Sequence, residues 1–369
     1  MDRKPLASYS SAIGAPAPGT AIVVLNWNGW SDTIECLESL FRLDPGPQRI
    51  VVCDNASEDN SLDHLIAWAE GRLNTIPPTK ADETRRLSFP PVVKPIPYKV
   101  YERAEAEAGG DLPDDAPRLA FIRTGANLGF AGGNNVGLRY LLADSSISAI
   151  WILNNDTVVE RSALGALVSE ALSNPAAGLI GATVLEYERP SMIQAQAGAK
   201  YLRCIGWATH IGAKRKWSDR LKKNSVEQQV DYILGASMFA TRAFLEKAGL
   251  MDESYFLYYE ELDWATKAAG RGALGYAPDA IVYHKMGRSI GTGRRLASGS
   301  ALSLYYLNRN RLLIARRHWP RFLLTTAAVN LFMTALLLMR FRLREAKAVL
   351  RATAVALSKP LDVAFRSAF

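Results

Sequence analysis

The sequence predicts an α/β fold built on a doubly wound, mostly parallel sheet. In the first half of the chain, four short apolar runs end in small polar residues, and each is followed by a segment with helical periodicity. This alternation is typical of βαβ units, whose right-handed crossovers bring the polar strand ends to one edge of the sheet. The expected strands are residues 21–26, 49–53, 119–123 and 149–153.

Helix signals follow each strand. After the first strand, Ser31 or Asp32 is expected to cap a helix, with Glu35 in position for a capping box. The next helices are expected at about 60–73, up to Leu141, and at 161–172. The pattern is less regular beyond them, and there the expected elements are strands at 178–185, 230–241 and 280–283 and helices at 241–249 and 260–269.

The chain divides into three parts by composition. Residues 1–19 are rich in Ser, Ala and Pro and are expected to form a flexible leader, and residues 20–293 the folded domain. Six prolines lie between Pro77 and Pro97, and an acidic stretch follows, so 76–118 is expected to be an insertion or long surface loop, partly disordered. Residues 294–369 form a basic tail with apolar helices.

The net charge of +8 belongs to the tail. Residues 294–369 carry 14 Lys or Arg and 2 Asp or Glu, a balance of +12, which leaves −4 for the rest of the chain. This distribution argues against a nucleic-acid-binding body and for a tail that meets an anionic surface. The three cysteines are widely spaced and match no metal pattern, which suggests a reducing compartment.

Polar residues follow the strands where ligands bind in open α/β sheets. Asn26, Asp54, the loop at Asn127 and Asp156 should therefore share one cleft. A carboxylate such as Asp54 can accept a hydrogen bond from a pyrimidine imide N–H, and capping of the next helix is an equally good explanation.

Asp156 with Asn154 two positions earlier resembles a D-x-D metal motif whose first Asp is replaced. Divalent cations that bridge phosphates need carboxylate oxygens and few protein ligands. His284 follows an expected strand and could be a second ligand, although a single His is more often structural.

The loop at residues 127–135 contains Gly129, Gly132 and Gly133 between a strand and a helix. Glycines allow close approach of the backbone to a ligand, and free amides at a helix start favour phosphate; a tight turn is the alternative explanation. The first βα turn lacks G-x-G-x-x-G, and the chain has no Walker A sequence, which disfavours a dinucleotide dehydrogenase.

An acidic cluster, Glu260, Glu261 and Asp263, opens an expected helix among several aromatic residues. The helix dipole alone favours acids in a first turn. Alternatively, one of them is a general base for a substrate hydroxyl, with the aromatic residues as a sugar-stacking wall.

Together these segments resemble inverting nucleotide-sugar glycosyltransferases of the GT-A fold, in family two. The likeness is greatest to bacterial rhamnosyl- and galactofuranosyltransferases of cell-surface polysaccharide assembly. The matching segments follow the family's order and begin at Ile22, Val52, Asn127, Leu153, Gly235 and Tyr258.

The resemblance implies a role for each matching residue. Asp54 would read the pyrimidine base, Asp156 and His284 would hold Mg²⁺ or Mn²⁺ on the diphosphate, and Glu261 would be the general base. Asp263 would hold the acceptor or the base. Further donor contacts are expected at Asn26, Asn127, Gly129, Gly132, Gly133, Asn134 and Asn155, and acceptor contacts at Gly235, Ala236 and Trp264. Asn154 departs from the Asp of many relatives, which leaves one charged ligand fewer.

The tail predicts membrane association. Residues 303–317 read as a basic helix with an apolar face, and residues 322–339 carry no charge. A spanning helix needs about 20 apolar residues, so an interfacial or shallowly inserted helix is preferred over a true span or a dimerisation helix. The surplus of arginine fits the cytoplasmic face of the inner or plasma membrane. That location suits a lipid-linked glycan acceptor, as the resemblance implies.

The leading hypothesis is transfer of a sugar, L-rhamnose from dTDP-rhamnose as the first choice, to a lipid-linked glycan. UDP-galactofuranose or another UDP-sugar is the alternative donor, and the enzyme is a possible homodimer. A nucleotidyltransferase is an alternative enzymatic hypothesis. The non-enzymatic hypothesis is a degenerate glycan-binding or scaffold protein; Asn154 alone supports it, and the presence of Asp156 and Glu261 argues against it.

Overall fold

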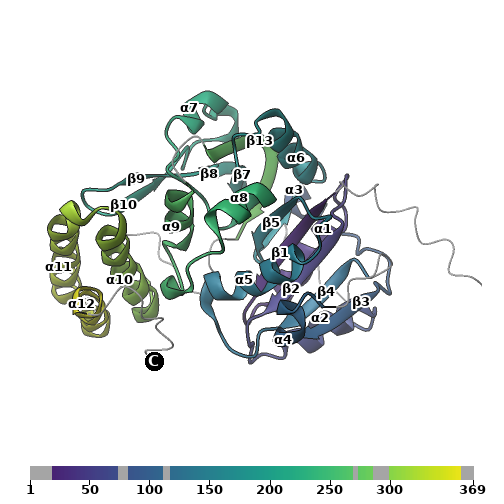
Figure 1. The fold of residues 1–369 in the computed structure, drawn as a ribbon, viewed down its shortest axis with the longest axis horizontal. Coiled ribbons are helices and arrows are strands. Elements are labelled where there is room, and N and C mark those ends of the chain that lie inside the picture. Colours follow the sequence, from purple (N-terminus) through teal and green to yellow (C-terminus); the bar gives the residue numbers. More distant parts are fainter. Residues whose placement is uncertain (1–18, 74–81, 111–116, 269–272, 286–298, 359–369) are drawn as a thin grey trace, which may run out of the picture.

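A mixed ten-stranded sheet forms the centre of the protein in the computed structural model (Figure 1). The structure describes residues 19–73, 82–110, 117–268, 273–285 and 299–358. The strand order is β3-β4-β2-β1-β5-β12-β7-β13-β6, and β8 pairs with β7 off this path. The expected leader over 1–19 lies almost wholly outside the described residues.

The four predicted strands are confirmed as the parallel part of this sheet. They are β1 (Thr20–Asn26), β2 (Arg49–Asp54), β4 (Leu119–Arg123) and β5 (Ala149–Asn154). Parallel neighbours of β1 lie on both sides, β2 on one and β5 on the other, so the strand order reverses here. Such a switch point opens a crevice beyond the carboxyl ends of the strands.

Helices cover both faces of the sheet, as a doubly wound fold requires. Alternate residues of β1 enter two separate cores, Ile22 and Val24 on one face and Ala21 and Val23 on the other. The helices that follow the parallel strands are α1 (Trp30–Leu40), α2 (Ser61–Ala69), α5 (Gly129–Leu142) and α6 (Ala163–Ser173).

The expected loop over residues 76–118 is corrected where the structure describes it. Strand β3 (Tyr98–Glu102) extends the sheet in parallel with β4, flanked by α3 (Asp82–Arg85) and α4 (Arg103–Glu107). Tyr101 is buried in this strand, with its ring centroid 5.2 Å from that of Tyr140 in α5. This aromatic contact gives the proline-rich segment a core to pack on.

The second half of the chain adds antiparallel strands to the sheet. They are β6 (Thr157–Val159), β7 (Leu179–Glu186), β8 (Arg189–Gln196), β12 (Ser237–Thr241) and β13 (Leu274–His284), of which β13 runs parallel to β7. A small second sheet contains β9 (Gly198–Leu202), β10 (Trp207–His210) and β11 (Tyr232–Ile233). The expected single strand over 230–241 is therefore two strands in different sheets. The helices here are α7 (Lys223–Glu227), α8 (Arg242–Ala248) and α9 (Glu260–Lys267).

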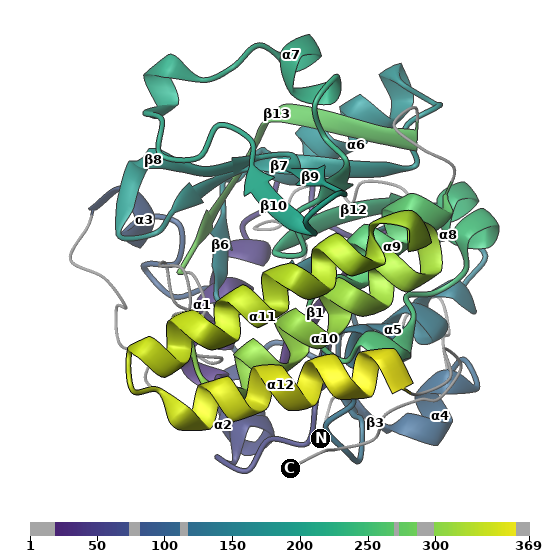
Figure 2. The ribbon, with the colours of Figure 1, turned by 90° about the vertical axis from the view of Figure 1, so that its left-hand side faces the viewer.

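Three C-terminal helices pack together beside the sheet domain (Figure 2). They are α10 (Ala301–His318), α11 (Leu323–Met339) and α12 (Leu343–Ser358). The expected boundary at residue 293 lies outside the described residues, and α10, which follows it, is integrated into the body. Asn310 of α10 donates to the carbonyl oxygens of Tyr255, Leu257 and Tyr258 at 2.7–2.9 Å.

Helix α11 carries an exposed apolar face. Leu324 is 85% exposed and Phe332 59%, and Pro320–Met339 is long and apolar enough to cross a membrane by length and composition. Asn330 on the same helix is fully buried and donates to the Asn308 carbonyl and the Thr353 hydroxyl, each at 3.0 Å. This polar residue of the uncharged stretch therefore faces the helical bundle.

Candidate active site

A cavity of about 610 Å³ opens at the carboxyl ends of β1 and β5. Its walls come from the sheet edge, the start of α9, the small sheet and α10. Among the predicted site residues, the structure brings six to this cavity: Asn155, Asp156, Gly235, Ala236, Glu261 and His284.

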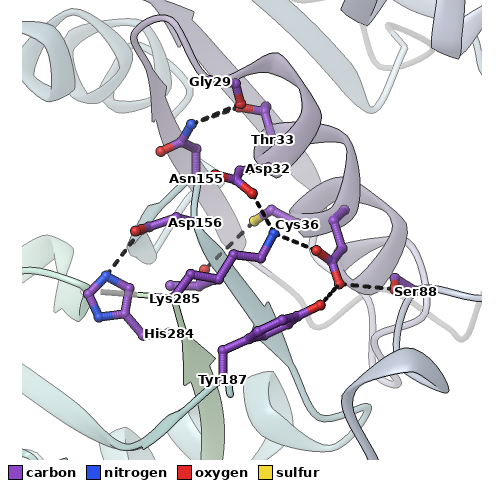
Figure 3. A network of polar contacts seen from close by, with 12 residues as sticks. Gly29, Asp32, Thr33, Cys36, Ser88, Asn155, Asp156, Tyr187, His284 and Lys285 are labelled. Carbon is purple, nitrogen blue, oxygen red and sulfur yellow. Dashed lines mark hydrogen bonds and ion pairs between the residues drawn. The ribbon is translucent and has the colours of Figure 1, made fainter. Parts of the chain in front are cut away.

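Asp156 and His284 meet on one wall of the cavity (Figure 3). Asp156 lies between β5 and β6, and His284 ends β13, which pairs with β6. His284 Nε2 lies 3.1 Å from Asp156 Oδ1, and its Nδ1 lies 2.9 Å from Gln194 Oε1. In the tautomer that donates from Nδ1 to Gln194, Nε2 presents a lone pair beside a carboxylate oxygen.

This donor pair fits a divalent cation. Imidazole nitrogen and carboxylate oxygen both suit Mn²⁺, and His284 Nε2, 3.1 Å from Asp156 Oδ1, makes no hydrogen bond of good geometry to the described residues. No group of three or more His, Cys, Asp or Glu residues in that part of the chain could hold a metal ion. A cation here would thus take its remaining ligands from phosphate oxygens and water.

A buried lysine follows His284 and holds this wall to α1 (Figure 3). Lys285 Nζ lies 2.5 Å from Asp32 Oδ1 and 2.5 Å from Glu35 Oε2, and its backbone N–H donates to the Asp156 carbonyl at 2.9 Å. Burial lowers the pKa of Lys285, but the two carboxylates outweigh it and raise that pKa overall. Sequence reasoning did not identify Lys285.

The predicted capping of α1 is wrong. Gly29 occupies the N-cap position and no side chain caps the helix. Asp32 and Glu35 turn instead toward Lys285, and Glu35 also accepts from the Tyr187 hydroxyl at 2.5 Å. The ammonium group of Lys285, which directly follows β13, binds these carboxylates. The spacing of residues within α1 does not reveal a partner that is so distant in the sequence.

Glu260 and Glu261 reach the cavity at the start of α9. Burial raises the pKa of Glu261 to about 7. Burial and the neighbouring Glu261 charge raise the pKa of Glu260 as well. A carboxyl group with a pKa near neutrality, on a cavity wall, is suited to accept a proton from a substrate hydroxyl.

The backbone before α9 is held in an unusual conformation. Phe256, Tyr258 and Tyr259 have φ values of 61°, 68° and 74°, in the left-handed region that non-glycine residues rarely adopt. The three hydrogen bonds from Asn310 to carbonyl oxygens of this segment stabilise it. Helix α10 therefore fixes the position of the backbone from which Glu260 and Glu261 project.

Asp263 and Trp264 do not line the cavity, and their expected contacts with the acceptor or the base stay predictions. Asp263 is fully buried and lies 2.7 Å from both His318 Nε2 and Lys267 Nζ. Trp264 is also fully buried and donates from Nε1 to the Gly249 carbonyl at 2.8 Å. Asp263, two positions after Glu261, points to another side of the helix, and the Trp264 side chain packs into the core.

The glycine- and asparagine-rich loop is closely packed, and the expected donor contacts of Gly129, Gly132, Gly133 and Asn134 stay predictions. A Cβ on Gly133 would lie 2.4 Å from Leu25 Cδ1, and one on Gly132 2.8 Å from Leu128 Cβ. Asn134 is fully buried and donates to the Phe130 carbonyl at 2.9 Å. These residues bring α5 close to β1 and lie outside the cavity lining.

Asn26 is likewise a buried structural residue. Its Nδ2 donates to Asp54 Oδ1 at 2.8 Å, and its Oδ1 accepts from the Thr33 hydroxyl at 2.8 Å. Asn155 Nδ2 donates to Thr33 Oγ1 at 3.0 Å and to the Gly29 carbonyl at 3.2 Å. Asp54 does not cap α2, whose N-cap is Asn60. Base recognition by Asp54 and donor contact by the exposed Asn127 stay predictions.

Several cavity residues were missed by sequence reasoning. Trp207, His210 and Gln194 come from β10 and β8, and Arg311 comes from α10. No strand was predicted over residues 189–210, and α10 was assigned to the tail. The fold brings these residues to the site, and no local sequence motif marks them.

The chain has relatives of known name, although no family model matches it. It is 26% identical over 251 residues to an N-acetylglucosaminyl-diphospho-decaprenol L-rhamnosyltransferase of Mycobacterium tuberculosis, covering 63% of this chain and 79% of the relative. It is 28% identical over 151 residues to a low-salt glycan biosynthesis hexosyltransferase of Haloferax volcanii, covering 41% of this chain and 46%, about half, of that relative.

The fold has counterparts among solved structures. The crystal structure of GalNAc-T7 with UDP, GalNAc and Mn²⁺ superposes with a TM-score of 0.51 at 13% identity, covering 83% of this chain and 49% of that one. The chain has the GT-A fold that is found in glycosyltransferases. An inverting activity similar to that of family two stays a prediction. Two curated relatives are named as a rhamnosyltransferase and a hexosyltransferase.

Proposed function

We propose that this glycosyltransferase moves a sugar, with inversion, from a pyrimidine nucleoside diphosphate to a lipid-linked glycan at a membrane surface. One observation carries the proposal: the Asp156–His284 pair and the Glu261 carboxyl line the same cavity. The pair suits the charged diphosphate end of a donor, and Glu261 suits an acceptor hydroxyl.

The residues of the chain divide the reaction between them. Glu261, ionised, takes the proton of the acceptor hydroxyl while that oxygen forms a bond to the anomeric carbon. The bond from this carbon to the diphosphate oxygen breaks on the opposite face, and the nucleoside diphosphate leaves with the electron pair. Asp156 and His284 would hold Mg²⁺ or Mn²⁺, which offsets the negative charge of the leaving diphosphate when bound.

The donor and acceptor are proposed from the relatives. The mycobacterial relative is named for L-rhamnose transfer to N-acetylglucosaminyl-diphospho-decaprenol, and a Shigella flexneri relative, 23% identical over 229 residues, is named a dTDP-rhamnosyl transferase. These names favour dTDP-rhamnose as donor, and a diphospho-polyprenol glycan as acceptor. UDP-galactofuranose or another UDP-sugar remains the second choice of donor.

A membrane surface is proposed from α11. Its solvent-facing side chains are mostly apolar, among them Leu324, Leu331, Phe332 and Met339, and Arg321 and Arg340 flank the helix. An apolar face with cations at its ends is typical of helices that lie in the interface of anionic lipid. We propose the cytoplasmic face of the inner or plasma membrane.

Ligand-induced stabilisation tests the donor. Unfolding is followed with UDP, dTDP and GDP, each with and without Mn²⁺, because a ligand that binds only the native state raises the melting temperature. A manganese-dependent rise with one pyrimidine diphosphate is expected. Transfer from the matching nucleotide sugar to N-acetylglucosaminyl-diphospho-decaprenol is then measured. No rise with any nucleotide and no transfer would contradict the proposal and favour a scaffold protein.

A further inference from the structure

Arg311 in α10 is a buried cation whose hydrogen-bond partners are neutral. The residue is 2% exposed, and its guanidinium donates to the Gly206 carbonyl at 3.2 Å, Asn308 Oδ1 at 2.8 Å and Asn330 Oδ1 at 3.0 Å. None of the ion pairs among the described residues involves Arg311, whereas the similarly buried Lys285 has two carboxylate partners. A buried charge without a counter-charge is costly, so this position is prepared for an anion.

Arg311 lies on the cavity wall at the side of the acidic pair. The Tyr259 hydroxyl donates to the same Gly206 carbonyl at 3.0 Å, and Tyr259 directly precedes Glu260 and Glu261. The Trp207 ring, also on the cavity wall, has its centroid 5.8 Å from the Arg311 guanidinium carbon. Asp156 and His284 come instead from the sheet edge, and Figure 1 draws α9 between α10 and β5.

Arg311 is also linked to the helices that carry the exposed apolar face (Figure 2). Asn330 of α11 accepts from Arg311 and donates to Thr353 of α12. The order along this part of the molecule is therefore Glu261, then Arg311, then the apolar face of α11. A lipid-linked sugar has the same order of chemistry, with a hydroxyl to be activated, a phosphate and a hydrocarbon chain.

We propose that Arg311, beside Trp207, binds the phosphate group that joins the acceptor sugar to its lipid. This inference rests on the proposed function for the identity of the acceptor, and it assigns a separate anion subsite to α10. A guanidinium presents a planar fork of N–H donors that matches phosphate oxygens, and a neutral glycoside offers it nothing comparable.

The test compares a prenyl diphosphate with its alcohol, without any transfer reaction. Melting temperatures of the full chain in detergent are measured with farnesyl diphosphate, farnesol and inorganic pyrophosphate. The variants are Arg311→Met, Arg311→Lys and the matched control Arg309→Met, which removes another buried guanidinium from the same helix but lies outside the cavity lining. Binding of UDP with Mn²⁺ is measured in parallel.

We expect farnesyl diphosphate to stabilise the unmodified protein and the Arg309→Met variant, and farnesol to do so much less. Arg311→Met should weaken farnesyl diphosphate binding at least tenfold, Arg311→Lys less, and neither should change UDP binding. Stabilisation by pyrophosphate as strong as by farnesyl diphosphate would assign the subsite to free anions and overturn a lipid-linked ligand.

Other outcomes overturn the inference and leave the proposed function intact. Equal binding of diphosphate and alcohol by the unmodified protein would do so even if the Arg311 variants fail to fold. Loss of UDP binding in Arg311→Met, with Arg311→Lys restoring it, would place the residue in the donor site. Absence of UDP binding by the unmodified protein would instead count against the proposed function.

Discussion

The imidazole of His284 lies 3.1 Å from the carboxylate of Asp156, although the two residues end elements that are far apart in the sequence. The antiparallel pairing of β13 with β6 sets this distance, because His284 is paired with Thr157, the residue after Asp156. Two donor atoms of different kinds are thereby fixed by a sheet register. The site is built before any ligand arrives, which lowers the entropic cost of binding.

Asp156→Asn and His284→Ala should each weaken manganese-dependent nucleotide binding by tenfold or more, because each removes one of the two protein donors. Isothermal titration with UDP or dTDP in Mn²⁺ measures the effect. Asp44→Asn, at an exposed carboxylate outside the cavity lining, is the control and should retain metal-dependent binding. Unchanged affinity in Asp156→Asn would remove this residue from the metal site.

Glu261 should give the transfer reaction a pH dependence near neutrality. The base acts in its ionised form, so with a pKa of about 7, kcat/KM should fall about tenfold for each pH unit below that value and level off above it. Glu261→Gln should abolish this dependence and lower kcat by about 10²–10⁴-fold, while UDP binding persists. A variant with full activity and the same pH profile would place the base elsewhere.

The sequence predicted the parallel half of the sheet because its strands are buried on both faces. Runs such as Ile22–Leu25 and Ile150–Leu153 are almost wholly apolar and end in asparagine, a pattern that needs no tertiary information. Strand β3 escaped prediction because prolines precede it and its packing partner, Tyr140, is distant in the sequence. Strands β8 to β10 alternate polar and apolar residues weakly and depend on pairing with each other and with β7.

The candidate site was predictable where function sits at a strand or helix end. Asp156, His284 and Glu261 occupy such ends, and the cavity contains all three. The glycines of the 127–135 loop pack closely, and the sequence does not separate this role from ligand approach, because both require a missing Cβ. Lys285 and Arg311 carried no local signal, since their importance comes from partners on other elements.

Lys285→Met should destabilise the fold by about 3–5 kcal/mol, because it leaves the buried Glu35 carboxylate and the partly buried Asp32 carboxylate without a cation. Urea unfolding at pH 7 measures the change. Adding Glu35→Gln to the variant should recover part of the loss. As a comparison, Arg161→Met breaks an exposed ion pair with Asp44 and should cost no more than about 1 kcal/mol. Equal losses in both would show that the buried cluster has no special role.

Leu331→Glu with Phe332→Glu should release the protein from anionic vesicles. Both side chains are more than half exposed on α11, and each fully inserted apolar side chain contributes about 1.5–3 kcal/mol. Sedimentation with phosphatidylglycerol vesicles measures the bound fraction. Leu172→Glu on α6 is the matched control, because Leu172 is 76% exposed and lies away from the C-terminal helices. Equal binding by all three proteins would contradict membrane contact through α11.

Substitution by alanine should lower the stability of the fold at Gly129 and the activity toward the acceptor at Gly235. Gly129 has φ of 72°, and a Cβ there would lie 2.2 Å from the Phe256 carbonyl oxygen, so Gly129→Ala should cost at least about 1–3 kcal/mol of stability. A Cβ on Gly235 would meet its nearest atom, Glu261 Oε1, at 3.7 Å, so Gly235→Ala should fold normally. That methyl group projects toward the base and should lower kcat/KM for the acceptor. Urea unfolding and acceptor kinetics on both variants separate the two roles, and a stable Gly129→Ala protein would show that the loop adjusts around the added methyl.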